Sequence, residues 1–73
     1  MSNMNFVICI NNAEYPAALE LRKIYQVIPD ELARDNNLIR IIDESGEDYL
    51  YPDVYFLAVD LPQPIKDAIL RAA

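Results

Sequence analysis

The stretch LIRIIDESGEDYLYP, residues 38–52, contains two runs of β-branched and aromatic residues on either side of an acidic turn. Runs of this composition are typical of β-strands. Gly46, the only glycine in the chain, lies between them, where a hairpin needs a residue that tolerates positive φ. The sequence therefore predicts a hairpin made of strands 38–43 and 48–51.

Three more strands are expected outside this hairpin. The apolar runs NFVICI, KIYQVI and FLAV indicate strands at residues 5–10, 23–28 and 56–59. Residues 11–21 are expected to form a long irregular loop, because Pro16 favours an extended conformation at the residue before it. Asp30 is a good N-cap for one helical turn at residues 31–34.

A short helix is expected at the C-terminal end. Pro64 suits the first helical position, and apolar residues then recur at helical spacing at Ile65, Ala68, Ile69 and Ala72. This apolar face fits either of two partners, the body of the same chain or a neighbouring subunit, and the sequence leaves both open.

These elements predict a mainly β fold, a small five-stranded barrel with a short C-terminal α-helix. A tight turn at residues 52–55 would precede the last strand. Closure into a barrel removes exposed sheet edges, which matters in a chain with little core. We expect one barrel domain at residues 1–60, followed by the helix at residues 61–73.

A family resemblance supports the barrel. Residues 50–56, LYPDVYF, resemble the end of an SH3-type barrel. Residues 19–56 resemble a group of small uncharacterised bacterial proteins, through RKIY at 22–25, PD at 29–30 and RIIDESGEDYLYP at 40–52. The resemblance implies an SH3-like barrel and brings no activity with it.

The resemblance to signalling SH3 domains also concerns binding. In those domains the equivalents of Pro52 and Tyr55 help form an aromatic platform for proline-rich peptides. This chain contains no tryptophan, which that platform needs, and no Ala-Leu-Tyr-Asp-Tyr run in its first loop. The resemblance therefore implies the fold and not the peptide specificity.

Composition excludes several classes of site. With one cysteine and no histidine, the 73 residues lack the ligands of a zinc centre, the pairs of a disulfide scaffold and the base of a Ser-His or Cys-His nucleophile. The acidic residues of the hairpin do not have the spacing of a calcium loop. We therefore expect no catalytic residues, no metal and no cofactor, and the protein is not expected to be an enzyme.

Charge and hydropathy bear on partners and compartment. The net charge of −6 argues against a nucleic-acid partner and favours a protein partner. No apolar run approaches the roughly 20 residues that span a bilayer, and the first residues lack the basic flank of a secretion signal, so no membrane is expected. Cys9, in an apolar run, is expected to be a free core thiol, which suits the cytoplasm.

Five tyrosines are the most informative feature for function. Tyr25 and Tyr51 are expected to line the core, with their hydroxyls reaching outward. Tyr15, Tyr49 and Tyr55 are candidates for one exposed partner-binding patch near Pro52, since tyrosine is enriched at interfaces. The favoured function is a non-catalytic protein-interaction or accessory module, monomeric or weakly self-associating. The alternative is a small acidic inhibitor or regulator that binds a basic surface of a partner enzyme.

Overall fold

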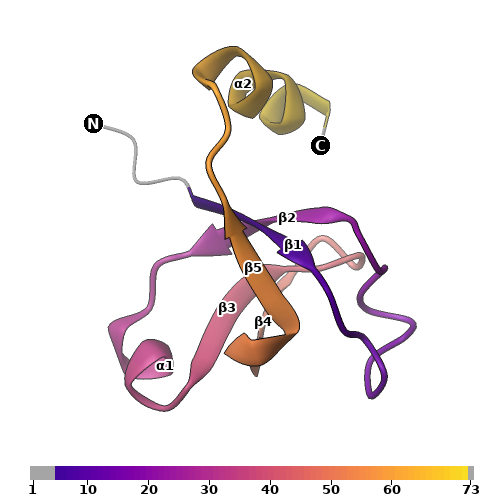
Figure 1. Cartoon of the computed structure of the whole chain (residues 1–73), viewed down its shortest axis with the longest axis vertical. Coiled ribbons are helices and arrows are strands. Elements are labelled where there is room, and N and C mark those ends of the chain that lie inside the picture. Colours follow the sequence, from indigo (N-terminus) through magenta and orange to yellow (C-terminus); the bar gives the residue numbers. More distant parts are fainter. Residues whose placement is uncertain (1–4, 73) are drawn as a thin grey trace.

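The computed structural model describes residues 5–72, and the expected domain limits at residues 1 and 73 lie outside them (Figure 1). Strands dominate the chain, as predicted. The elements in chain order are β1 (Asn5–Cys9), β2 (Ile24–Ile28), α1 (Glu31–Asp35), β3 (Leu38–Ile42), β4 (Asp48–Pro52), η1 (Asp53–Tyr55), β5 (Phe56–Val59) and α2 (Gln63–Ala72). The predicted strands differ from these at their ends by a residue at most.

The five strands form one antiparallel sheet in the order β4-β3-β2-β1-β5. β2 pairs with β1 along Ile24 to Val27, and with β3 through Val27 and Ile28. β2 therefore pairs with β1 over most of its length and with β3 only at its end, and Val27 belongs to both pairings. β4 and β5 are the edges of the sheet, and no pairing between them closes it. The five antiparallel strands are confirmed, whereas closure into a barrel stays a prediction.

The hairpin between β3 and β4 has the expected geometry. Gly46 has a φ of 84°, and its N–H donates to the carbonyl of Asp43 at 3.0 Å. The Asp43 carboxylate accepts from the Ser45 N–H at 2.9 Å and so caps this turn. Asp43 is only 7 % exposed, unlike the other acidic residues of the turn.

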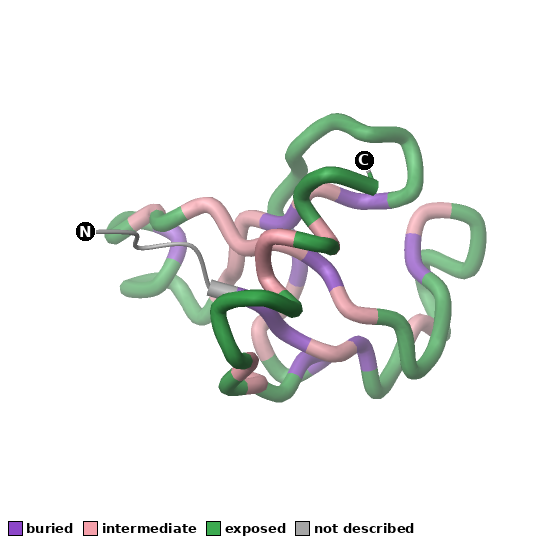
Figure 2. The backbone as a smooth tube through the Cα atoms, turned by 90° about the horizontal axis from the view of Figure 1, so that it is seen from above, coloured by how far each residue is buried: buried purple, intermediate pink, exposed green. Residues whose placement is uncertain are grey.

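The core lies within the curve of the sheet and is covered by the β1–β2 loop. Its buried members include Val7 and Cys9 of β1, Ile41 of β3 and Leu19 of the loop. Figure 2 shows buried segments on the strands, mostly exposed residues in the loops, and exposed and intermediate residues along the C-terminal helix. Cys9 is a free and fully buried thiol, which confirms the prediction that it is a core residue.

The two helices differ in how they meet the sheet. As expected, Asp30 caps α1 by accepting from the Ala33 N–H at 3.0 Å, and Asn37, at a φ of 60°, follows the end of the helix. α1 packs beside β3. α2 has no buried residue, and its Ile69 and Ala72 border a shallow hollow together with Arg22, Lys23 and Ile24 at the start of β2. Both expected partners of its apolar face, the body of the same chain and a neighbouring subunit, stay predictions.

Candidate functional site

Two of the predicted site residues, Tyr15 and Tyr55, lie in one aromatic cluster with Tyr51. Tyr15, in the β1–β2 loop, meets the Tyr51 ring edge-on, with 5.0 Å between ring centroids and an interplanar angle of 84°. It also meets the Tyr55 ring of η1 at 6.1 Å. Tyr49 lies two residues before Tyr51 on β4, and both of their side chains project to the same side of the strand. The rings come from segments far apart in the sequence, and the fold brings them together.

Exposure divides this cluster into an outer and an inner part. Tyr15 and Tyr49 are 39 % and 51 % exposed, whereas Tyr55 is only 7 % exposed. The prediction of an exposed Tyr55 is thus wrong, because η1 turns this ring toward Tyr15 and into the core. Pro52 is half-buried at the end of β4, directly before η1, and its role in binding stays a prediction.

Carboxylates accept hydrogen bonds from four tyrosine hydroxyls. These bonds join Tyr25 to Glu44 at 2.5 Å, Tyr49 to Glu47 at 3.3 Å, Tyr51 to Asp43 at 2.5 Å and Tyr55 to Glu14 at 2.5 Å. Sequence reasoning missed this pattern. Glu14 and Tyr55 are 41 residues apart, and the Glu47-Tyr49 spacing, typical of neighbours on one strand face, is the only local signal for any of the pairs.

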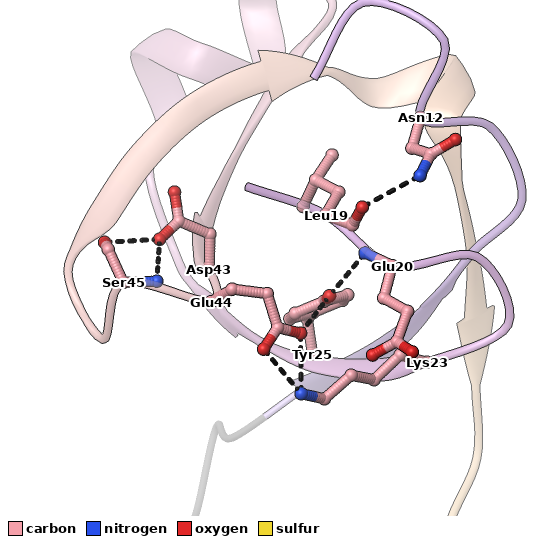
Figure 3. A network of polar contacts seen from close by, with 8 residues as sticks. All are labelled: Asn12, Leu19, Glu20, Lys23, Tyr25, Asp43, Glu44 and Ser45. Carbon is pink, nitrogen blue, oxygen red and sulfur yellow. Dashed lines mark hydrogen bonds and ion pairs between the residues drawn. The ribbon is translucent and has the colours of Figure 1, made fainter. Parts of the chain in front are cut away.

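The loop that carries Tyr15 is fixed to the β3–β4 turn (Figure 3). The Tyr25 hydroxyl accepts from the Glu20 N–H at 2.7 Å and donates to Glu44, whose carboxylate also pairs with Lys23 at 2.6 Å. The Glu44 N–H in turn donates to the carbonyl of Ala18 at 3.0 Å. Tyr15 is therefore displayed on a loop with defined anchors and not on a free segment.

Further bonds within the loop set its shape. Asn12 donates from its side-chain amide to the carbonyl of Leu19 at 2.9 Å, across seven residues (Figure 3). The Ala13 N–H donates to the Asn11 side chain at 2.9 Å, the turn that an Asn-Asn pair favours. The Tyr15 carbonyl accepts from the N–H of Leu19, whose side chain is in the core.

These contacts shift several pKa values. Burial acts to raise the pKa of Asp43, but hydrogen bonds from Ser45 and Tyr51 outweigh it and lower the value. Burial, and then the bond to Asp43, raise the pKa of Tyr51, to which nearby Tyr15 and Tyr49 also contribute. The bond to Glu14 is the main cause that raises the pKa of Tyr55 to about 12. At neutral pH the phenols of Tyr51 and Tyr55 are therefore neutral and the Asp43 carboxylate is charged.

Glu14, Asp43 and Glu47 are the carboxylates beside these rings, and within the described part of the chain no Lys or Arg forms an ion pair with them. The ion pairs there are Lys23 with Glu44, and Arg40 with Asp30 and Asp48. Glu14, Asp43 and Glu47 bond instead to neutral hydroxyls. We call the outer rings of Tyr15 and Tyr49, with the exposed Glu14 and Glu47, the tyrosine face. It combines aromatic surface with uncompensated negative charge.

Residues 5–72 hold no group of three or more acidic, cysteine or histidine side chains placed to bind a metal ion. A cavity of about 350 Å³ lies elsewhere, between β2, α1 and β3, and sequence reasoning did not anticipate it. Within the same residues, no helix is both long and apolar enough to cross a bilayer.

No protein-family model, curated protein or solved structure matches the chain, so function is argued from its geometry.

Proposed function

We propose that this protein is a non-catalytic interaction module, an SH3-like barrel whose tyrosine face binds a partner protein. The observation that carries the proposal is the exposure of the Tyr15 and Tyr49 rings near Glu14 and Glu47, which bond to the Tyr55 and Tyr49 hydroxyls and which no described cation neutralises. A partner that presents arginine or lysine side chains fits such a face. A cation attracts both the carboxylates and the faces of the aromatic rings.

The barrel is supported by the order of the elements. The sheet order β4-β3-β2-β1-β5, a long β1–β2 loop and a 3-10 turn between β4 and β5 are the arrangement of an SH3-like barrel. β2 contributes to two pairings, as a strand shared by the two halves of a bent sheet does. In this arrangement the loop and the 3-10 turn stand on the same side, which is where Tyr15 meets Tyr55.

The proposal of a non-catalytic role rests on the state of the carboxylates. A general acid at neutral pH needs a raised pKa, usually from burial without compensating donors. Asp43 is buried, but the hydrogen bonds from Ser45 and Tyr51 lower its pKa. Glu44 has its pKa lowered by Lys23 and Tyr25. Both carboxyl groups are therefore charged at neutral pH and poorly suited to donate a proton as a general acid.

The test is affinity capture from the native host, with the immobilised full chain as bait and mass spectrometry as readout. We expect Tyr15→Ala and Tyr49→Ala baits to lose a specific partner. Leu50→Ala is the matched control, because Leu50 is a comparably exposed residue of β4 on the opposite side of the strand. Equal capture by all three variants, with folds intact by circular dichroism, would count against the tyrosine face.

The alternative is a small acidic inhibitor or regulator that covers a basic surface of an enzyme. The net charge of −6 favours it. Binding dominated by charge weakens steeply as salt rises through the physiological range, whereas binding through rings is much less sensitive. A salt titration of the captured complex separates the two.

The buried free thiol of Cys9 is consistent with a reducing compartment such as the cytoplasm.

A further inference from the structure

We propose that two copies of this chain associate by helix exchange, with α2 of each copy seated in the groove beside α1 of the other. The exchange uses surfaces separate from the tyrosine face. It is carried by two partly exposed apolar surfaces at opposite ends of one molecule, a helix and a groove, whose charges complement each other. It buries the part of the helix face that its own chain leaves exposed.

α2 has one apolar face, which its own chain covers only in part. Ile65, Ala68, Ile69 and Ala72 form a stripe at positions i, i+3, i+4 and i+7 of this ten-residue helix. Ile69 and Ala72 border a shallow hollow with Ile24 of β2, but Ile65 is 47 % exposed and no residue of α2 is buried. A short helix gains most of its stability from burying such a face, so the exposed part of the stripe is available to a second molecule.

A groove with an apolar floor lies between β2, α1 and β3. The cavity of about 350 Å³ is walled by Val27, Ile28, Leu38 and Ile39, all partly buried. Leu32 of α1 and Val54 of η1 are next in sequence to residues that line it, and they are 76 % and 72 % exposed. A groove of this kind receives the apolar face of an amphipathic helix.

α2 cannot easily reach this groove within one molecule. Figure 1 places α2 at one end of the molecule and α1 at the other. The connection from β5 to α2 is residues 60–62, and prolines at positions 62 and 64 restrict its conformations. A second copy has no such constraint, and a two-fold arrangement lets each copy supply one helix and one groove.

The charges of helix and groove also agree. α2 carries Lys66 and Arg71 against Asp67. At the groove, Arg40 is already paired with Asp30 and Asp48, each at 2.9 Å. The other charges that line it are Glu31 and Asp53 against Arg34. A weakly basic helix thus meets a weakly acidic rim, which offsets part of the repulsion between two chains of charge −6.

The size of the contact predicts a weak dimer. Ten helical residues span about 15 Å, and one such helix covers less than a stable interface requires, so the reciprocal second contact is needed. Sedimentation equilibrium of the full chain from about 10 µM to about 1 mM should show a transition from one chain to two. A chain that stays monomeric throughout would overturn the proposal.

Variants assign the dimer to its two surfaces. Ile65→Glu/Ile69→Glu should weaken dimerisation at least tenfold, whereas Leu70→Glu, on another side of the same helix, should leave it within about twofold. Glu31→Lys at the groove rim should also weaken it. Dimerisation unaffected by Ile65→Glu/Ile69→Glu, or weakened by the helix variants but not by Glu31→Lys, contradicts helix-in-groove exchange.

A peptide titration locates the contact directly. A synthetic peptide of residues 61–73 is added to the full-length Ile65→Glu/Ile69→Glu chain, and methyl resonances are followed by NMR. We expect shifts at Val27, Ile28, Leu38 and Ile39, and none with a peptide carrying the same two substitutions. Shifts confined to α2 or to the tyrosine face would show that the helix binds elsewhere and would refute the groove as its site.

Discussion

Replacement of Tyr51 by phenylalanine tests the buried pair at the centre of the aromatic cluster. The Tyr51 hydroxyl donates to Asp43 Oδ2 at 2.5 Å, and the two residues are 4 % and 7 % exposed. Phenylalanine keeps the ring and its contacts with Tyr15 and Phe56, and removes one oxygen atom. The variant thus isolates a single hydrogen bond to a buried carboxylate.

The expected loss of stability is about 1.5 to 3 kcal/mol, the usual contribution of a hydrogen bond to a charged group. Asp43 keeps its bonds from the Ser45 N–H and hydroxyl, so the carboxylate is not left without partners. A chain of 73 residues has a total stability of about 4 to 11 kcal/mol. A loss of about 2 kcal/mol would lower the midpoint of thermal unfolding by about 8 to 16 °C.

The assay is urea unfolding followed by circular dichroism, at pH 7 and at lower pH. Tyr49→Phe is the matched control, because its hydroxyl lies 3.3 Å from Glu47 at the surface, and its unfolding midpoint should match that of the parent chain. A Tyr51→Phe chain as stable as the parent would refute the reasoning, since the buried hydroxyl would then contribute nothing.

The same variant changes the response to acid. The pKa of Asp43 is lowered in the folded chain, so its contribution is complete above the unfolded value of about 3.9 and is lost as pH falls through the folded value. Loss of the Tyr51 hydroxyl removes one cause of that lowering. The advantage of the parent chain over Tyr51→Phe should therefore be largest at neutral pH and shrink as pH falls below about 4 toward the folded pKa of Asp43; an advantage that grows in acid would contradict this.

Three further predictions follow from single residues. Gly46→Ala should cost about 1 kcal/mol in unfolding experiments, because φ is 84° and the added Cβ meets no atom within 4 Å, so only backbone strain acts. Tyr55 should titrate near pH 12 by ultraviolet absorbance, and its contribution to stability, complete below pH about 10, should fade as pH rises toward that value. Cys9 should resist a thiol reagent in the native chain and react fully in urea, because it is fully buried.

The sequence predicted the parts of the fold that short-range chemistry controls. Gly46 marked the turn because its φ is positive, and Asp30 marked the start of α1 because its side chain accepts from Ala33 N–H. The strands followed from β-branched and aromatic runs. Each of these signals lies within a few residues of the feature that it predicts, so no knowledge of the tertiary structure was needed.

Features set by tertiary structure were not predicted. Tyr55 was expected at the surface because tyrosine is enriched at interfaces, but its position depends on how η1 sets it against Tyr15, a residue 40 positions away. The burial of Asp43 likewise depends on Tyr51, across the hairpin. For α2, the apolar stripe was evident in the sequence, whereas the exposure of its residues is a property of the three-dimensional fold.

The tyrosine–carboxylate bonds tie stability and recognition together in this small chain. A core of this size contributes little, so the hydroxyls of Tyr25, Tyr51 and Tyr55 that meet carboxylates help to fix a loop or a turn. Two of the carboxylates, Glu14 and Glu47, also give the tyrosine face its charge. Asp43→Asn would disturb the fold, because Asp43 accepts from Ser45 and from buried Tyr51. Glu47 accepts only at the surface, from Tyr49 and at 3.3 Å, so a change of charge there alters the face while the core stays intact.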